Sequence, residues 1–367
     1  MRILFAGGGT AGHISPALAI AEIITDRYSE AEIAFVGRNN GSENKAIENE
    51  GYKLYTLDVM GFQRSLSKKN FSAIKKLIKS QREARNILSD YTPDLVIGTG
   101  GYVCYPILKS SIKKKIPTLI HESNAYPGLV TRILSGRCNC VMIGEDSCRK
   151  YLGTRAKCET VGNPIRKKFV EVSRQRARAL LNVQKEETFI LSFGGSGGAD
   201  VLNDTVIKVM RSYSAKAPKV KHVHATGKTH FAKIENNFPD LCRGISGCKV
   251  IPYIDNMPIM MNAADIVISR SGAMTLAEIK VTDAIPILIP SPNVAANHQY
   301  HNAKVLEESR EALLIEEDTL SDKALTKLID ELISSPEKRR KIIEKKRISK
   351  SIPQNKRILD IIDKYIT

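Results

Sequence analysis

The sequence predicts an α/β protein with two Rossmann-like, parallel-sheet domains that face each other across a cleft. Two glycine-rich turns support this prediction, Gly7–Gly12 and Gly194–Gly198, because each directly follows a short apolar strand and precedes a helix. The length of 367 residues also fits two domains of roughly 150 to 200 residues better than one core.

Short apolar or β-branched runs alternate with longer amphipathic stretches through both halves of the chain. This alternation is typical of βαβ units, which build parallel sheets. In the first half we predict strands at 3–6, 33–36, 53–57, 95–97, 118–120, 141–143 and 159–161. In the second half we predict strands at 189–193, 222–225, 249–252, 266–268, 286–289 and 312–315.

Turn-forming residues mark the boundary between the halves. Gly162, Asn163 and Pro164 form a candidate hinge, and a charged helical stretch follows to about Leu181. From Pro336 onward the pattern predicts two helices separated at Pro353, the last of which returns to the first domain. The expected segments are a first domain at 1–165, a second at 166–345 and a final helical segment at 346–367.

The first glycine turn satisfies the dinucleotide pattern G-x-G-x-x-G but lacks the acid that normally follows the second strand. Arg38 stands in that region and the first acid is Glu43, so NAD is disfavoured and NADP survives only as a rival. A tight turn without a ligand is the structural alternative. His13 follows the turn at the start of a helix, where an imidazole could deprotonate a hydroxyl or simply cap the helix or orient a substrate.

The second glycine turn and the segments after it carry groups suited to a nucleotide. A helix start beside the hydroxyl of Ser196 could stabilise a diphosphate leaving group. Glu278 lies early in the next predicted helix after a small-residue turn, where its two oxygens could accept both ribose hydroxyls or only favour the helix dipole. The loop 292–299 is rich in amide and imidazole groups that could bind sugar hydroxyls.

Composition sets limits on the class of protein. The formal charge of +17 predicts an anionic partner, but we find no nucleic-acid signature, and no window is long and apolar enough for a membrane span. The first residues read as a strand and not as a secretory signal, so we expect the chain to stay in the cytoplasm. The seven cysteines lack zinc spacing and read as reduced thiols, and no Asp-x-Asp occurs, so we expect no metal or cofactor.

Basic residues gather beside apolar ones in two places in the first half. Residues 64–85 contain eight Lys or Arg and one acid, with apolar residues at helical spacing among them, and a short run of three lysines between two isoleucines follows at 112–116. If both lie on one face they form a patch for anionic lipid; the alternative is an ordinary helix with a solvated basic face. The expected patch consists of Phe71, Ile74, Lys75, Lys76, Ile78, Lys79, Ile112, Lys113, Lys114 and Lys115.

Seven segments, taken in order, resemble the MurG family of GT-B glycosyltransferases, bacterial enzymes that add N-acetylglucosamine (GlcNAc) from UDP-GlcNAc to lipid I. The match extends nearly end to end, and the order of several motifs is specific where any single one is not. The segments are GGGTAGH (7–13), HESNAYPG (121–128), VGNPIR (161–166), GGSGGA (194–199), PYIDNM (252–257), SRSGAMTLAE (269–278) and NHQYHNA (297–303).

The resemblance implies an inverting, metal-independent transfer to the C4 hydroxyl of the lipid-linked muramoyl sugar in peptidoglycan synthesis, at the cytoplasmic face of the membrane. His13 and Glu122 are the implied candidates for activating the acceptor, and we favour His13. Implied substrate contacts are Thr10, Ala11, Gly12 and Asn124 near the donor sugar and acceptor, Arg166 and Ser196 on the diphosphate side, Ile254 at the uracil, Ala273, Met274, Thr275, Leu276, Ala277 and Glu278 at the phosphate and ribose, and Gln299 at the GlcNAc hydroxyls.

Two positions depart from the family pattern, and three other functions stay open. The family more often has Gln where Ser123 and Gly197 stand, so any donor contact made by the second Gln is lost here. The rivals are another GT-B enzyme with a lipid acceptor, such as a diacylglycerol glycosyltransferase, an NADP-dependent dehydrogenase, and a non-catalytic protein that binds anionic lipid.

Overall fold

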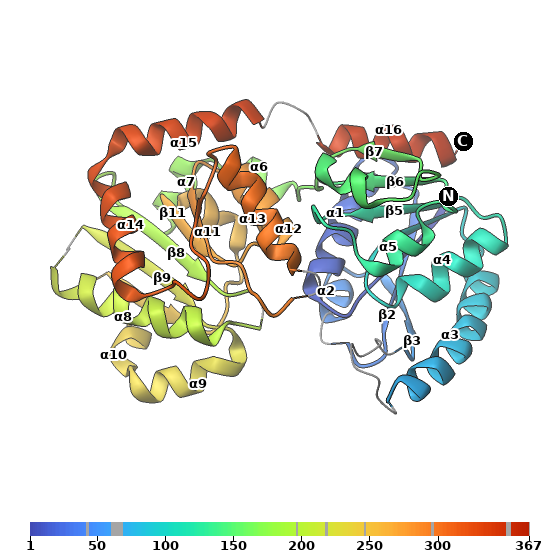
Figure 1. Ribbon diagram of the computed structural model, residues 1–367, viewed down its shortest axis with the longest axis horizontal. Coiled ribbons are helices and arrows are strands. Elements are labelled where there is room, and N and C mark those ends of the chain that lie inside the picture. The colour runs from blue at the N-terminus through green and yellow to red at the C-terminus, as the bar shows by residue number, and fades with distance from the viewer. Residues whose placement is uncertain are drawn as a thin grey trace. The chain divides into compact units, whose positions relative to one another are not determined.

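The chain folds into two compact α/β units, one of Met1–Arg166 with Pro353–Thr367 and one of Lys167–Ile352 (Figure 1). The computed structural model describes residues 1–41, 44–59, 69–195, 197–216, 219–245, 247–294, 297–349 and 354–366. Each unit is built on one parallel sheet, which confirms the predicted fold class of two Rossmann-like domains.

The first unit has a seven-stranded sheet in the order β3-β2-β1-β4-β5-β6-β7. The order reverses between β1 and β4, because the chain winds outward from β1 in both directions. The strands are β1 (Arg2–Gly7), β2 (Glu32–Arg38), β3 (Lys53–Leu57), β4 (Leu95–Gly100), β5 (Thr118–Glu122), β6 (Cys140–Ile143) and β7 (Cys158–Thr160).

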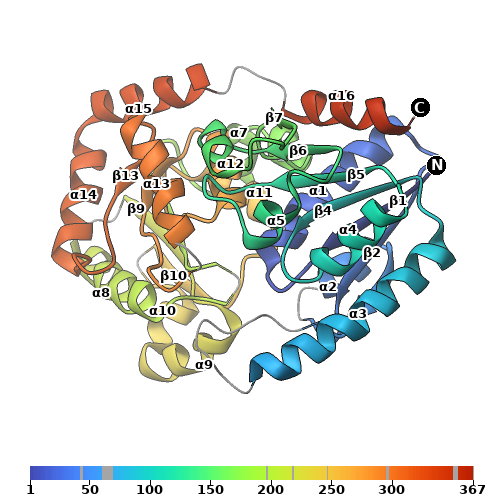
Figure 2. The same ribbon diagram turned by 45° about the vertical axis from the view of Figure 1, so that its right-hand side comes forward.

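Helices cover both faces of this sheet, and each face has its own apolar core. Ile3 and Phe5 of β1 pack toward α1 and α16, and the alternate residues Leu4 and Ala6 pack toward α3 and α4. Helix α3 and helix α16 lie on opposite sides of the unit (Figure 2). The helices are α1 (Ala11–Arg27), α2 (Asn44–Asn49), α3 (Lys69–Tyr91), α4 (Cys104–Lys113), α5 (Leu129–Leu134), the 3₁₀ helix η1 (Asp146–Tyr151) and α16 (Gln354–Ile366).

The last helix belongs to the first unit although it follows the whole second unit in sequence. Ile358, Ile361 and Ile362 of α16 are buried in the core beneath α1. Asp363 accepts a hydrogen bond from the hydroxyl of Tyr28 at 2.9 Å. Burying this apolar face stabilises α16 and ties the C-terminal end of the chain to its beginning.

The second unit has a six-stranded parallel sheet in the order β10-β9-β8-β11-β12-β13, which reverses between β8 and β11. Its strands are β8 (Thr188–Phe193), β9 (Val220–Ala225), β10 (Cys248–Ile251), β11 (Ile266–Ser269), β12 (Ile285–Leu288) and β13 (Leu313–Leu314). Its helices are α6 (Lys168–Glu171), α7 (Arg174–Leu180), α8 (Asp200–Lys216), α9 (Lys228–Asn237), α10 (Pro239–Arg243), α11 (Met257–Ala263), α12 (Ala273–Lys280), α13 (His298–Glu308), α14 (Asp322–Ser334) and α15 (Pro336–Ser349).

Each of the thirteen predicted strands overlaps a strand of the structure. The charged stretch after the hinge differs, because it forms the two short helices α6 and α7 and not one helix. Ser173 stands between them in an extended conformation, and its hydroxyl accepts a hydrogen bond from the backbone N–H of Arg176 at 3.2 Å. This N-cap starts a new helix where the pattern alone suggests continuity.

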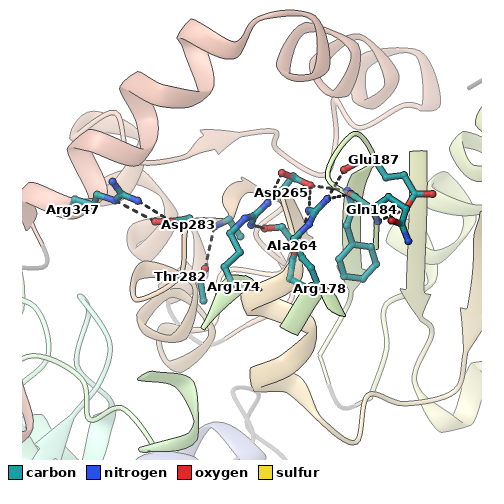
Figure 3. Close-up of polar contacts among 12 residues, drawn as sticks. Arg174, Arg178, Gln184, Glu187, Ala264, Asp265, Thr282, Asp283 and Arg347 are labelled. Atoms are coloured by element: carbon teal, nitrogen blue, oxygen red, sulfur yellow. Dashed lines mark hydrogen bonds and ion pairs between the residues drawn. The ribbon is translucent and has the colours of Figure 1, made fainter. Parts of the chain in front are cut away.

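An arginine cluster anchors α7 to the second sheet (Figure 3). The carboxylate of Asp265, just before β11, accepts from Arg174 at 2.6 Å and from Arg178 at 2.9 Å. It also accepts from the backbone N–H of Phe189 at 2.8 Å, which joins β8 to the same group. Because Asp265 and Arg178 are largely buried, these charge-assisted bonds fix the position of α7 more firmly than surface pairs would.

The expected segment 346–367 begins too early. Helix α15 continues through Lys346, whose buried ammonium donates to the backbone carbonyl of Thr282 at 3.1 Å. The next residue, Arg347, pairs with Asp283 at 3.0 Å (Figure 3). These contacts hold the end of α15 on the second unit, which therefore extends past residue 345.

Three buried histidines should make the fold sensitive to acid. Burial lowers the pKa of His121 to about 4, of His222 to about 3 and of His224 to about 4. The unfolded chain takes up these protons near pH 6.5, so stability is complete above that pH and falls as the pH drops toward 4. At pH 5 each histidine should cost about 2 kcal/mol of unfolding free energy.

Urea denaturation at pH 7.5 and pH 5, followed separately in the two units, measures this effect. The second unit holds two of the three histidines and should lose more stability than the first. Replacing His222 and His224 with glutamine should flatten the pH dependence of the second unit, whatever its absolute stability. An unchanged pH slope in that variant would show that other groups cause the acid sensitivity.

Candidate active site

Two glycine-rich segments meet at the point where the first sheet reverses its strand order. One follows β1 at Gly7–Gly12, and the other follows β4 at Gly100 and Gly101. The backbone N–H of Gly8 points to the carbonyl of Gly100, with a nitrogen–oxygen distance of 3.4 Å. Open parallel sheets bind ligands at such reversal points, beyond the carboxyl ends of the strands.

The imidazole of His13 rests on the backbone of this second glycine segment. A Cβ added to Gly100 would lie 2.3 Å from Nδ1 of His13, and one added to Gly101 would lie 3.3 Å from its Cδ2. Both glycines have positive φ, 119° and 84°. Thr99 donates from its hydroxyl to the backbone carbonyl of His13 at 2.7 Å. The half-exposed ring is therefore placed by β4 as well as by its own helix.

Residues 10–12, which the family resemblance implies as substrate contacts, lie directly beside His13. Thr10 is exposed and extended at the start of α1, and its side chain makes no capping hydrogen bond. The backbone of Ala11 begins the helix, and Gly12 is exposed. The backbone N–H of His13 donates to the carbonyl of Thr10 at 3.1 Å, so the start of α1 joins these two residues.

Glu122, the second candidate base, has a carboxylate already occupied by four donors. One oxygen accepts from the backbone N–H and side-chain amide of Asn124 at 3.1 and 3.0 Å. The other accepts from the N–H of Gly128 at 2.9 Å and the hydroxyl of Thr131 at 2.8 Å. A carboxylate offers about four acceptor sites, so all are used. These contacts favour a role for Glu122 in holding Asn124 and the start of α5.

Ser123 and Arg166 also make contacts within the first unit. Ser123 is buried, and its hydroxyl lies 3.3 Å from Nδ1 of His121. The guanidinium of Arg166 contacts Glu50 at 2.6 Å and Glu22 at 3.7 Å. Because these two carboxylates already compensate its charge, a diphosphate contact by Arg166 stays a prediction.

The second sheet repeats this arrangement at its own reversal point. The turn Gly194–Gly198 follows β8, and the segment before α12 follows the neighbouring strand β11. Gly198 and Gly227 have φ of 81° and 84°, and a Cβ on Gly227 would lie 2.5 Å from the backbone nitrogen of Gly198. This close backbone approach shapes the end of the turn. Ser196 lies outside the described residues.

Helix α12 begins at this edge, and its first backbone amides point out of the helical ladder. Leu276 is the first residue whose N–H bonds back into the helix, to the carbonyl of Gly272, so the amides of Ala273, Met274 and Thr275 precede the helical ladder. The side chains of Met274 and Leu276 are buried, so a ligand would meet these residues through their backbone. Such a helix start favours phosphate.

Of the residues expected to contact the donor, Gln299 has contacts beside the turn before α12. Glu278 and Ala277 are half-buried further along the helix. The backbone carbonyl of Gln299 accepts from the hydroxyl of Ser271 at 2.8 Å, and its side-chain oxygen accepts from the N–H of Ser291 at 2.9 Å. The structure therefore brings the start of α13 against the turn before α12. Ile254, after β10, is buried, and a contact of its backbone with the uracil stays a prediction.

The expected membrane patch is described only in part. The side chains of Phe71, Ile74, Lys75 and Lys76 lie outside the described residues. Ile78 is 69% exposed, whereas Ile112 packs against the core. Lys113 to Lys115 are exposed, and Lys114 donates to Ser89 of α3 at 2.8 Å, so this cluster adjoins the far end of α3. None of the described helices is long and apolar enough to span a membrane.

Lys79 makes an ion pair with Glu83, one turn along α3, at 3.6 Å. Within the described part of the chain, no group of three or more His, Cys, Asp or Glu side chains could hold a metal ion.

Sequence reasoning missed Gly100 and Gly101, although a signal was present. The run Gly98-Thr99-Gly100-Gly101 follows a strand, just as the first glycine turn does. It also missed the exposed apolar residues Leu129 and Ile133 of α5, which are 50% and 47% exposed.

Comparison with known families identifies both units. Residues 3–143, in the first unit, match the glycosyltransferase family 28 N-terminal domain. Residues 189–363, which cover most of the second unit and much of α16, match the glycosyltransferase family 28 C-terminal domain.

Curated relatives match over nearly the full length. The UDP-N-acetylglucosamine–N-acetylmuramyl-(pentapeptide) pyrophosphoryl-undecaprenol N-acetylglucosamine transferase of Acetivibrio thermocellus is 39% identical, covering 96% of this chain and 94% of the relative. The protein of the same name from Halothermothrix orenii is 37% identical over 97% and 96% of the two chains.

Solved structures share the fold. The crystal structure of Acinetobacter baumannii MurG superimposes with a TM-score of 0.74 at 23% identity over 99% of both chains. The UDP-GlcNAc 2-epimerase of Neisseria meningitidis bound to UDP-GlcNAc superimposes with a TM-score of 0.67 at 14% identity, covering 99% of this chain and 100% of the epimerase.

Proposed function

Because the chain belongs to glycosyltransferase family 28, we propose that it transfers GlcNAc from UDP-GlcNAc to the C4 hydroxyl of the muramoyl sugar of lipid I, which yields lipid II. The observation that carries this proposal is the similarity over nearly the full length, at 37% to 41% identity, to relatives named for that transfer. The geometry at the two reversal points supports a different role for each unit: the first activates the acceptor and the second holds the donor.

In the proposed reaction the first unit activates the acceptor. His13 takes the proton of the acceptor's C4 hydroxyl while the oxygen of that hydroxyl attacks the anomeric carbon of GlcNAc. This attack inverts the anomeric centre. The support for this role is the fixed position of the imidazole on Gly100 and Gly101 beside the start of α1. The four donors around Glu122 support a positioning role for that carboxylate.

In the same reaction the second unit holds the donor and stabilises the departing UDP. Negative charge develops on the leaving diphosphate as the glycosidic bond breaks. The backbone of Gly194–Gly198 and the leading amides of α12 offer hydrogen-bond donors and a helix dipole for that charge. We propose that these groups do so without a metal ion, since the chain contains no Asp-x-Asp segment.

Replacing Glu278 with alanine should weaken donor binding. We propose that its carboxylate accepts both ribose hydroxyls, and loss of two charge-assisted hydrogen bonds should raise the dissociation constant of UDP by about 10²-fold. Calorimetric titration with UDP measures this. Glu308, at the end of α13, serves as the control, since its replacement removes an exposed carboxylate away from the α12 start. UDP affinity unchanged in the Glu278 variant would remove the ribose role.

The membrane contact of the proposed enzyme is a separate expectation. We propose peripheral binding to anionic lipid on the cytoplasmic face through α3, α4 and α5. The supporting observations are the exposed lysines at 113–115, the exposed Ile78, Leu129 and Ile133, and Arg132 stacked over the Tyr126 ring at 5.4 Å. Apolar side chains beside cationic ones suit the boundary between headgroups and acyl chains.

Replacing Lys113, Lys114 and Lys115 with serine should weaken binding to phosphatidylglycerol-containing vesicles by about 10²-fold, since each lysine near such a surface contributes about 1 kcal/mol. Added salt should release the wild-type protein in the same cosedimentation assay. Replacing Arg339, Arg340 and Lys341 of α15 with serine provides an equal charge change in the second unit. Equal losses in the two variants, or salt-insensitive binding, would contradict a specific basic patch.

A matrix of donors and acceptors tests the proposed function against its nearest rival. UDP-GlcNAc, UDP-glucose and UDP-galactose are each offered with a lipid I analogue and with diacylglycerol. We expect turnover with UDP-GlcNAc and the lipid I analogue, undiminished by EDTA. Preferred transfer of glucose or galactose to diacylglycerol would instead identify a different lipid glycosyltransferase.

A further inference from the structure

Behind the second glycine turn lies a buried chain of polar side chains that the proposed mechanism does not use. Ser192 of β8, His222 and His224 of β9, and Asn203 of α8 are all at most 1% exposed. The Ser192 hydroxyl oxygen lies 2.7 Å from Nε2 of His222 and 2.9 Å from Nδ1 of His224. Nε2 of His224 lies 3.1 Å from Oδ1 of Asn203.

This series of hydrogen-bonded side chains ends at the backbone that supports the turn. The side-chain amide of Asn203 donates to the carbonyl of Thr226 at 3.0 Å. A Cβ added to Gly198, the last residue of the turn, would lie 2.0 Å from that same carbonyl oxygen. Asn203 therefore fixes the surface against which Gly198 packs, one helical turn after the glycine segment enters α8.

Only one direction of hydrogen bonding satisfies these neutral groups. The Thr226 carbonyl can only accept, so the NH₂ of Asn203 must face it and Oδ1 must face His224. Nε2 of His224 then carries the proton, its Nδ1 accepts from the Ser192 hydroxyl, and that hydroxyl accepts from Nε2–H of His222. Burial keeps both rings neutral, with the pKa of each well below its ordinary value.

We propose that Asn203, held by this directional chain through His224 and Ser192, is a positioning residue that sets the geometry of the diphosphate-binding turn. The inference rests on the proposed function in that the turn is taken as the site of the UDP diphosphate. Reversing one member of the chain places two acceptors or two donors together and displaces the Thr226 carbonyl, and with it Gly198.

Asn203→Asp tests this proposal, because it places a carboxylate oxygen against the Thr226 carbonyl in place of the amide donor. The substitution hardly changes the volume of the side chain. We expect the dissociation constant of UDP and the KM for UDP-GlcNAc to rise at least about tenfold, with the KM for lipid I within about twofold of wild type. Thr205→Val is the matched control. It removes a buried side-chain donor from the same helix, the Thr205 hydroxyl, which donates to the backbone carbonyl of Val201 within α8. A folded Asn203→Asp variant with wild-type UDP affinity, or an equal loss in Thr205→Val, overturns the proposal.

Two further measurements keep the test decisive. If Asn203→Asp does not fold, Ser192→Ala breaks the chain one step further from the turn and should weaken UDP binding about threefold; wild-type affinity there overturns the proposal. Nitrogen-15 NMR of the wild type should show the Nε2–H tautomer for His224 with Nδ1 as an acceptor, and the opposite tautomer overturns the direction of the chain.

UDP titration needs no acceptor, so it separates the two proposals. A protein that binds UDP but transfers no sugar contradicts the proposed function. The positioning role of Asn203 is then still tested by the UDP affinity of its variants. A wild type that does not bind UDP contradicts both.

Discussion

Replacing His13 with alanine is expected to lower kcat for GlcNAc transfer by about 10²- to 10⁴-fold, the usual contribution of a positioned general base. The dissociation constant of UDP should stay within about twofold of wild type, because the donor contacts that we propose lie in the second unit. Steady-state kinetics with a lipid I analogue and calorimetry with UDP measure the two quantities on the same preparation.

Glu122→Gln is the comparison for this experiment. The amide keeps the shape of the side chain and one acceptor oxygen but loses the charge that holds Asn124 and Gly128. We expect a smaller loss in kcat than for His13→Ala, accompanied by a lower melting temperature. Unchanged turnover in His13→Ala, together with a large loss in Glu122→Gln, would transfer the role of base to Glu122.

Gly100→Ala is expected to lower kcat by about 10²-fold or more, although residue 100 has no side chain to contribute. The added Cβ would lie 2.3 Å from Nδ1 of His13, so the imidazole must leave its position. The backbone φ of 119° adds strain for any residue with a Cβ. The variant should therefore resemble His13→Ala in kinetics while it keeps the imidazole.

Gly51→Ala separates strain from displacement. Gly51 also has a positive φ, 78°, but a Cβ there would meet no atom within 4 Å. We expect Gly51→Ala to lose some stability and to keep wild-type turnover. If both glycine variants lose turnover equally, the effect comes from backbone strain, and the contact between Gly100 and His13 does not place the base.

The elements that depend on local pattern were predictable from the sequence. Strands with apolar cores and glycine turns carry their signal within a few residues, which is why the parallel sheets and the turn at Gly194–Gly198 were placed correctly. The break between α6 and α7 was not predicted, because it depends on a single capping residue, Ser173, within a charged stretch.

Features that depend on packing between distant segments were not predictable. The side chain of His13 lies against Gly100, 87 residues later, a contact that exists only once β1 and β4 are neighbours in the sheet. In the same way, nothing local to Glu122 reveals that the chain turns back so that Thr131 of α5 donates to its carboxylate. Such occupation of an acceptor depends on the fold, and the residue type alone does not reveal it.

The proposed function of this protein is to join GlcNAc from UDP-GlcNAc to lipid I, with His13 as the base. Its most direct test is to incubate purified protein with radiolabelled UDP-GlcNAc and a lipid I analogue and to determine the linkage of the product. We predict one GlcNAc joined with inverted configuration to the C4 oxygen of the muramoyl sugar, formed by the wild type and nearly lost in His13→Ala. No transfer with or without detergent, or a product with retained configuration, would contradict the claim.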